Sequence, residues 1–146
     1  MKLQSRQFPF ALVLTALLTL SGAFADIPLD TSMKSLAGGL KAVQSALKTI
    51  AASPMAGHQS EWANAKSGAA VMLAAAGDAK TQFPPNVAGD TKAEAAFSAA
   101  ILDLQTAIQN LLVKAIDQQE LNDAQAAVTA ILDKKADGHT TFIPHH

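Results

Sequence analysis

Residues 32–52 read SMKSLAGGLKAVQSALKTIAA, and this stretch decides the fold class. Its apolar positions are spaced three and four residues apart: Met33, Leu36, Leu40, Val43, Leu47 and Ile50. That spacing puts them on one stripe of a helix that packs against other helices. We expect Thr31 or Ser32 to cap the N-terminus. Gly38-Gly39 either weakens the helix locally or lets a neighbour or ligand approach closely.

Three further blocks repeat this spacing. The second runs from about Ser60 to Gln82 and stops before Pro84-Pro85, because proline lacks the N–H that a helix needs. The third begins at Thr91, where Thr91-x-x-Glu94 resembles a capping box. Its stripe contains Phe97, Ile101, Leu104, Ile108, Leu111 and Ala115. The fourth begins near Asn122, and its stripe contains Ala124, Val128, Ile131 or Leu132, Lys135, His139 and Phe142.

Four helices joined by short connections predict an all-α fold, an antiparallel up-down-up-down four-helix bundle. A signal peptide is expected to precede it. Lys2 and Arg6 come before the uncharged apolar run 8–20, and Ala23-Phe24-Ala25 supplies the small residues that signal peptidase requires. We therefore expect residues 1–25 to be removed on export, leaving one domain, residues 26–146, with no membrane attachment.

Composition excludes several function classes. The chain has no cysteine, so thiolate metal sites and cofactor attachment through Cys-x-x-Cys-His are excluded. Without the signal, nine basic and 12 acidic residues remain, a formal charge of −3 with no basic patch, so nucleic-acid binding is not expected. No nucleophile with a suitable base, no paired carboxylates and no glycine-rich phosphate loop are evident. We therefore do not expect an enzyme.

The predicted topology brings a thioether and an imidazole to one end of the bundle. Antiparallel first and fourth helices place the first turn of one beside the last turn of the other, so Met33 and His139 meet at one end of the core. A stripe methionine is most often a core residue, and an inward histidine is often only hydrogen-bonded. Together, however, a thioether and an imidazole are the axial ligands of electron-transfer haem proteins.

The mature chain resembles the soluble cytochrome b562 family along nearly its whole length. The motifs that carry the resemblance are Ala25-Asp26-Ile27, Met33-x-x-Leu36-x-x-x-Leu40-Lys41, Met72-x-Ala74-Ala75-Ala76-x-Asp78-Ala79 before Pro84-Pro85, Phe97, and Ala124-Gln125-Ala126-Ala127 followed by His139. The resemblance implies a bacterial periplasmic electron carrier with one noncovalent haem b. Met33 and His139 would bind the iron axially, and redox proteins of the periplasm would be its partners.

The resemblance also implies a lining for the porphyrin, with the protein acting as a monomer. Phe97, Ile101, Leu36 and Met72 are expected to line the ring, and Lys135 is expected to lie near a propionate. Three positions depart from the family pattern. Lys135 replaces a common arginine, Ile101 replaces a second aromatic residue, and Gly138 replaces the aromatic residue that commonly precedes the axial histidine.

These departures keep two alternatives open. The first is a haem-free periplasmic bundle of the same ancestry, acting as a binding or chaperone-like protein. The second is a metal-binding module that uses His139 with the C-terminal pair His145 and His146. We prefer a solvated tail for that pair, because chain termini commonly fray.

Overall fold

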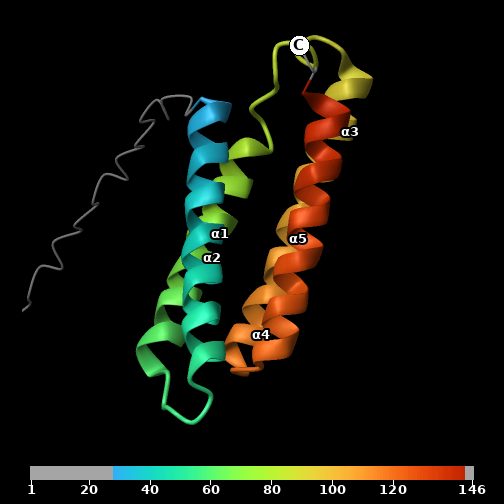
Figure 1. Cartoon of the computed structure of the whole chain (residues 1–146). Coiled ribbons are helices and arrows are strands. Elements are labelled where there is room, and N and C mark those ends of the chain that lie inside the picture. The colour runs from blue at the N-terminus through green and yellow to red at the C-terminus, as the bar shows by residue number, and fades with distance from the viewer. Residues whose placement is uncertain (1–27, 144–146) are drawn as a thin grey trace, which may run out of the picture.

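The computed structural model describes residues 28–143, in which helices alternate with connections and no strand occurs. The helical elements are α1 (Leu29–Ala52), α2 (Gln59–Ala79), α3 (Thr91–Ala107), the π-helical segment η1 (Ile108–Val113), α4 (Lys114–Asp117) and α5 (Leu121–Phe142). Because α3, η1 and α4 follow one another without a break, they form one long helix, and the described residues build a four-helix bundle (Figure 1). The predicted signal peptide, residues 1–25, lies outside the described residues.

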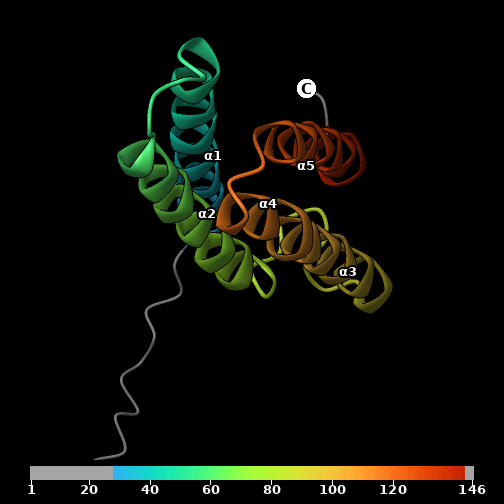
Figure 2. The ribbon, with the colours of Figure 1, turned by 90° about the horizontal axis from the view of Figure 1, so that it is seen from below.

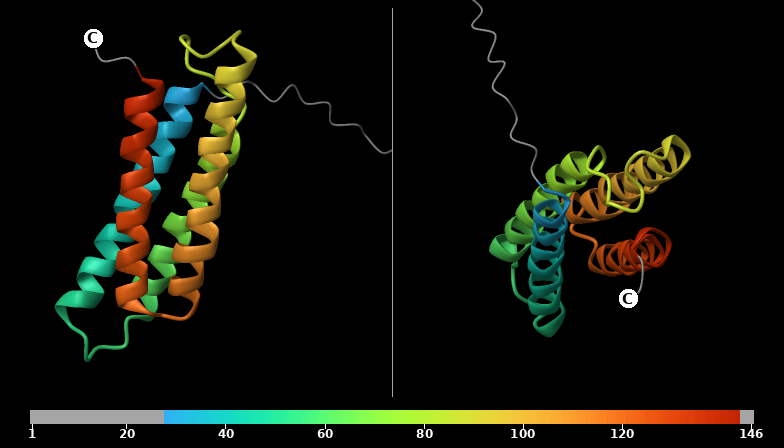
Figure 3. Two further views of the ribbon diagram at one scale, coloured as in Figure 1. Left: turned by 90° about the vertical axis from the view of Figure 1, so that its right-hand side faces the viewer. Right: turned by 90° about the horizontal axis from the view of Figure 1, so that it is seen from above.

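The first turn of α1 and the last turn of α5 lie at the same end of the bundle, and the connection between α1 and α2 lies at the other end (Figures 1 and 3). Viewed along the bundle, α1 and α2 form one pair, while the long third helix and α5 form the other (Figure 2). This arrangement brings residues from near both ends of the described chain together at one end of the core.

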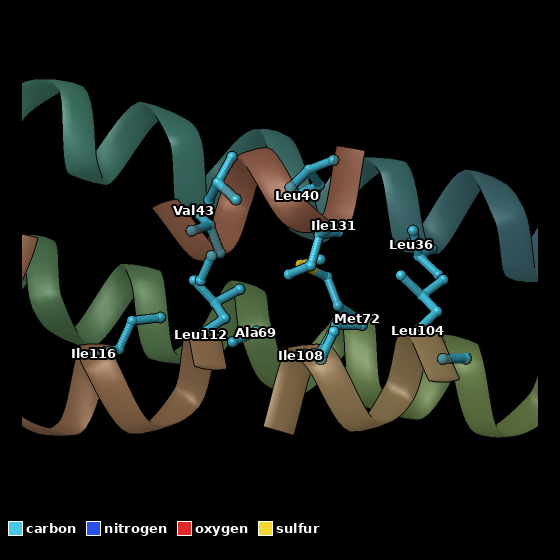
Figure 4. Close-up of a cluster of buried hydrophobic side chains, with 14 of the residues drawn as sticks. Leu36, Leu40, Val43, Ala69, Met72, Leu104, Ile108, Leu112, Ile116 and Ile131 are labelled. Atoms are coloured by element: carbon cyan, nitrogen blue, oxygen red, sulfur yellow. The ribbon is translucent and has the colours of Figure 1, made fainter. Parts of the chain in front are cut away.

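Side chains from all four helices fill the core (Figure 4). The labelled residues are Leu36, Leu40 and Val43 of α1, Ala69 and Met72 of α2, Leu104, Ile108, Leu112 and Ile116 of the third helix, and Ile131 of α5. The α1–α2 pair also contains a direct backbone contact, because a Cβ added at Gly39 would lie 2.6 Å from the carbonyl oxygen of Gly68. The close approach expected at Gly38-Gly39 therefore occurs at Gly39.

Within the π-helical segment, the leucine that faces the core differs from the predicted one. The expected stripe included Leu111, but that side chain is 49% exposed, whereas Leu112 is fully buried. The predicted stripe positions on either side of it, Ile108 and Ala115, are both buried, so the departure is confined to this one position. The prediction of an inward Leu111 is therefore wrong.

Helix starts differ from the predicted caps by a few residues. α1 begins directly after Pro28 with no side-chain cap, although Thr31 or Ser32 was the expected cap. At α3 the capping residue is Asp90, whose carboxylate accepts hydrogen bonds from the backbone N–H groups of Lys92 and Ala93. Aspartate and threonine both cap helices well. Because Asp90 and Thr91 are adjacent, the sequence alone does not decide which of them caps α3.

One helix of the described chain, Thr91–Asp117, is long and apolar enough to cross a membrane by length and composition alone. Its inward face is buried in the bundle, including Phe97, Leu104 and Ile108. Core helices of globular proteins meet the same criteria, so this property carries no membrane assignment.

Candidate functional site

Met33 and His139 line the same cavity. Met33 lies in the second turn of α1 and is half-buried against the core. His139 lies in the last turn of α5, at the same end of the bundle. The cavity between them has a volume of about 240 Å³. Both predicted ligand residues therefore line one cavity at one end of the bundle.

His139 lies at the rim of this cavity and not on the buried face of α5. Val128 and Ile131 are buried, and the half-buried positions that continue this face toward the C-terminus include Gly138 and Phe142. The side chain of His139 falls beside that face and is exposed. The expectation that His139 lies on the inward stripe is thus met only in part, since the residue lines the cavity but is exposed.

The predicted lining residues Leu36, Phe97, Ile101 and Lys135 all contribute to the cavity wall. Met72 does not: its side chain is fully buried in the central layer of the core, where its Cγ lies beside the Gly39 backbone. Met72 therefore packs the α1–α2 pair and is the one predicted site residue that lies off this cavity.

Aromatic rings close one side of the cavity. The ring of Phe97 is buried, and the ring of Phe142 meets it edge to face, with centroids 5.3 Å apart. Phe83 packs on Phe97 in the same manner at 6.0 Å. Edge-to-face pairs of this kind are favourable contacts. Phe142 was not predicted as a lining residue, although its position three residues after His139 places it on a neighbouring part of the same helix surface.

Cationic side chains surround the mouth. Lys34 of α1 and Lys134 and Lys135 of α5 all line the cavity. Lys34 forms an ion pair with Asp30 at 2.7 Å, and Lys134 forms one with Asp103 across to α3. Lys34 and Lys134 were not predicted to belong to the site, because in the sequence each is only a charged residue adjacent to a predicted site residue. The site therefore combines an apolar wall with three lysines, of which Lys34 and Lys134 form ion pairs with aspartates.

Within residues 28–143 no group of three or more His, Cys, Asp or Glu side chains could hold a metal ion. His145 and His146, required by the metal-binding alternative, lie outside the described residues. His58 is distant from the cavity: it lies in the connection between α1 and α2, where its Nε2 lies 2.6 Å from the carbonyl oxygen of Ser53.

The chain matches no protein-family model, no curated protein and no solved structure. The resemblance to the soluble cytochrome b562 family thus remains a prediction from the motifs.

Proposed function

We propose that the protein is a periplasmic electron carrier that holds one noncovalent haem b, with Met33 sulfur and an imidazole nitrogen of His139 as axial ligands. One observation carries the proposal: both side chains, from opposite ends of the described chain, line one apolar cavity. When bound, haem with this ligation supplies a one-electron centre with no open position for dioxygen.

The other residues of the site suit a flat apolar group with acidic substituents. Leu36, Phe97 and Ile101 offer apolar surface to the ring. Lys135 lies at the rim, where its ammonium group can meet a propionate as a point charge. Because the binding face is buried between helices while the rim is charged, the acidic groups would face solvent.

Haem binding requires the cavity to widen. Pockets for drug-sized ligands hold roughly 300–1,000 Å³, and a porphyrin is a large ligand on that scale. The cavity of about 240 Å³ is smaller. The side chain of Phe142, which lines the cavity beside Gly138, is the group that would move.

A haemin titration followed by absorbance tests this proposal. The wild-type protein is expected to give a sharp low-spin Soret band and alpha band, with quenching of the single tryptophan, Trp62. Met33→Ala is expected to convert the iron to high spin, and His139→Ala to remove most of the binding.

Matched controls use the same residue types away from the site. Met55 is 98% exposed, and His58 lies at the opposite end of the bundle, so Met55→Ala and His58→Ala are expected to keep the wild-type spectrum. The proposal fails if wild-type protein gives no low-spin spectrum, or if the site and control variants behave alike.

A haem-free bundle that binds a small apolar molecule is the second candidate. It is favoured by the size of the cavity and by the ring of Phe142 against Phe97. A ligand that binds only the native state must raise the melting temperature. An unchanged melting temperature in excess haemin would therefore support this candidate over the first.

We further propose an antiparallel up-down-up-down topology and export through cleavage after Ala25. The shared position of the α1 start and the α5 end supports the topology (Figure 3). The signal-like residues 1–25 support the export. N-terminal sequencing of protein released by osmotic shock tests both the cleavage point and the periplasmic location.

A further inference from the structure

The connection between α2 and α3, residues 80–90, contacts both helix turns that bear the proposed iron ligands. It lies at the cavity end of the bundle, and Pro84 lines the cavity (Figure 1). Two of its side chains, Gln82 and Asn86, form hydrogen bonds to different helices, α1 and α5. The connection is therefore in contact with both sides of the site.

The first of these bonds holds the start of α1. Ser32, which immediately precedes Met33, is only 2% exposed, and its hydroxyl donates to Gln82 Oε1 at 2.9 Å. The N-cap residue of α1 is Pro28, and it makes no side-chain capping bond. A helix start without a cap frays easily, because its first N–H groups lack partners. The bond to Gln82 thus restrains a turn that has little local support.

The second bond holds the end of α5. Asn86 Nδ2 donates to the backbone carbonyl oxygen of Phe142 at 3.0 Å. That carbonyl is among the last four of the helix, which have no partner within it. Phe142 lies three residues after His139, and its ring packs on Phe97. The bond therefore restrains the turn that carries the imidazole.

The connection is itself fixed to the bundle. Val87 is buried, and its N–H donates to the carbonyl oxygen of Pro84 at 2.8 Å. The hydroxyl of Ser98 in α3 donates to the carbonyl oxygen of Lys80 at 3.0 Å. The connection can hold the two helix ends in place only if it is itself fixed, and these contacts fix it to the bundle.

We infer that residues 80–90 act as a brace that sets the separation of Met33 and His139, with Gln82 and Asn86 as positioning residues. The inference rests on the proposed function, because the separation matters for a ligand that both side chains clamp. Neither residue touches the iron. Each acts through the helix turn that it holds.

The test compares haem release by wild type, Gln82→Ala and Asn86→Ala, with the exposed Gln44→Ala as control. Loss of one hydrogen bond is expected to speed release by about two- to tenfold, with a larger high-spin fraction for Gln82→Ala because Met33 is freed. Gln44→Ala is expected to match wild type.

Conservative variants separate positioning from general structural damage. Gln82→Glu keeps an oxygen that accepts from Ser32, so it is expected to restore slow release. Asn86→Asp keeps the shape but lacks the donor, so it is expected to behave like Asn86→Ala. If Gln82→Glu fails to restore slow release, or Asn86→Asp restores it, the brace is not the cause.

Hydrogen exchange without haem separates this inference from the proposed function. Gln82→Ala is expected to speed exchange in the first turns of α1, and Asn86→Ala in the last turn of α5. If the wild-type protein does not bind haem, the proposed function is wrong, and hydrogen exchange without haem alone tests the brace. If Gln82→Ala and Asn86→Ala show the same hydrogen exchange and haem release as Gln44→Ala, the inference of a brace is wrong.

Discussion

Where α1 crosses α2, the two backbones approach so closely that a side-chain carbon has no room, whereas at the cavity the helices are kept apart by side chains. A Cβ on Gly68 would lie 2.8 Å from the carbonyl oxygen of Gly39. At the other region, Met33 and His139 line a cavity together with side chains that can rotate, such as Phe142. Backbone contact cannot adjust without moving a whole helix, but side chains can change rotamer. We therefore expect only the cavity end to widen for a ligand.

The largest expected effect is the difference in stability between alanine variants of the two methionines. Met72 is fully buried at the crossing, so Met72→Ala is expected to lower the free energy of unfolding by about 2–5 kcal/mol. Met33 is half-buried, so Met33→Ala is expected to cost about 1 kcal/mol in the protein without haem. Urea unfolding followed by Trp62 fluorescence measures both. Equal losses would show that the two regions are packed alike.

The adjacent glycines give a matched second test. Gly39→Ala places Cβ against the Gly68 backbone and is expected to destabilise the protein by about 1–3 kcal/mol. Gly38→Ala meets nothing within 4 Å, so it is expected to stabilise the helix by about 0.5–1 kcal/mol. Thermal melts of both variants measure the difference in sign. If Gly39→Ala does not lower the melting temperature, α1 and α2 can move apart where they cross.

The spacing of apolar residues was enough to predict the helices and to predict that the start of the first lies near the end of the last. The stripe from Met33 to Ile50 indicated where the first helix runs. The pair Pro84-Pro85 indicated that the second helix stops, although α2 ends earlier than expected, at Ala79. The position of Met33 near one helix start and His139 near another helix end predicted a shared site, and both line one cavity. These features follow from periodicity and chain direction, which a sequence contains.

Features set by neighbouring helices were not predictable in this way. Whether Leu111 or Leu112 of the π-helical segment faces the core depends on what the third helix packs against. The assignment of Met72 to the crossing depends on Gly39 lying opposite it. The exposed placement of His139 depends on how α5 lies on α1 and α3. Each requires knowledge of distances between helices, which spacing along one helix does not contain.

Gly138 offers a smaller test, at the cavity end. A Cβ added at this helical glycine meets nothing within 4 Å, so Gly138→Ala is expected to raise the free energy of unfolding by about 0.5–1 kcal/mol. Urea unfolding of the haem-free protein measures the gain. A loss of stability instead would show that this end is closed more tightly than the cavity of about 240 Å³ indicates.

The smallest effect is expected at the end of the bundle opposite the cavity, where the carboxylate of Glu61 is stabilised in its charged form. The Ser60 hydroxyl donates to Glu61 Oε2 at 2.8 Å, and this bond lowers the pKa of Glu61, with smaller contributions from its own backbone N–H and from His58. A lowered carboxyl pKa in the folded state adds stability above the ordinary value, and that stability is lost as pH falls through the folded-state pKa.

The gap in unfolding free energy between wild type and Glu61→Gln is therefore expected to narrow as pH falls from about 5 to 3. Urea unfolding across that range measures the gap. Removing the main donor should weaken the dependence, so the gap between Ser60→Ala and the double variant Ser60→Ala, Glu61→Gln is expected to change less with pH. A gap that widens toward low pH would mean that the folded state favours the protonated carboxyl, which is incompatible with the Ser60 hydroxyl donating to a charged Glu61.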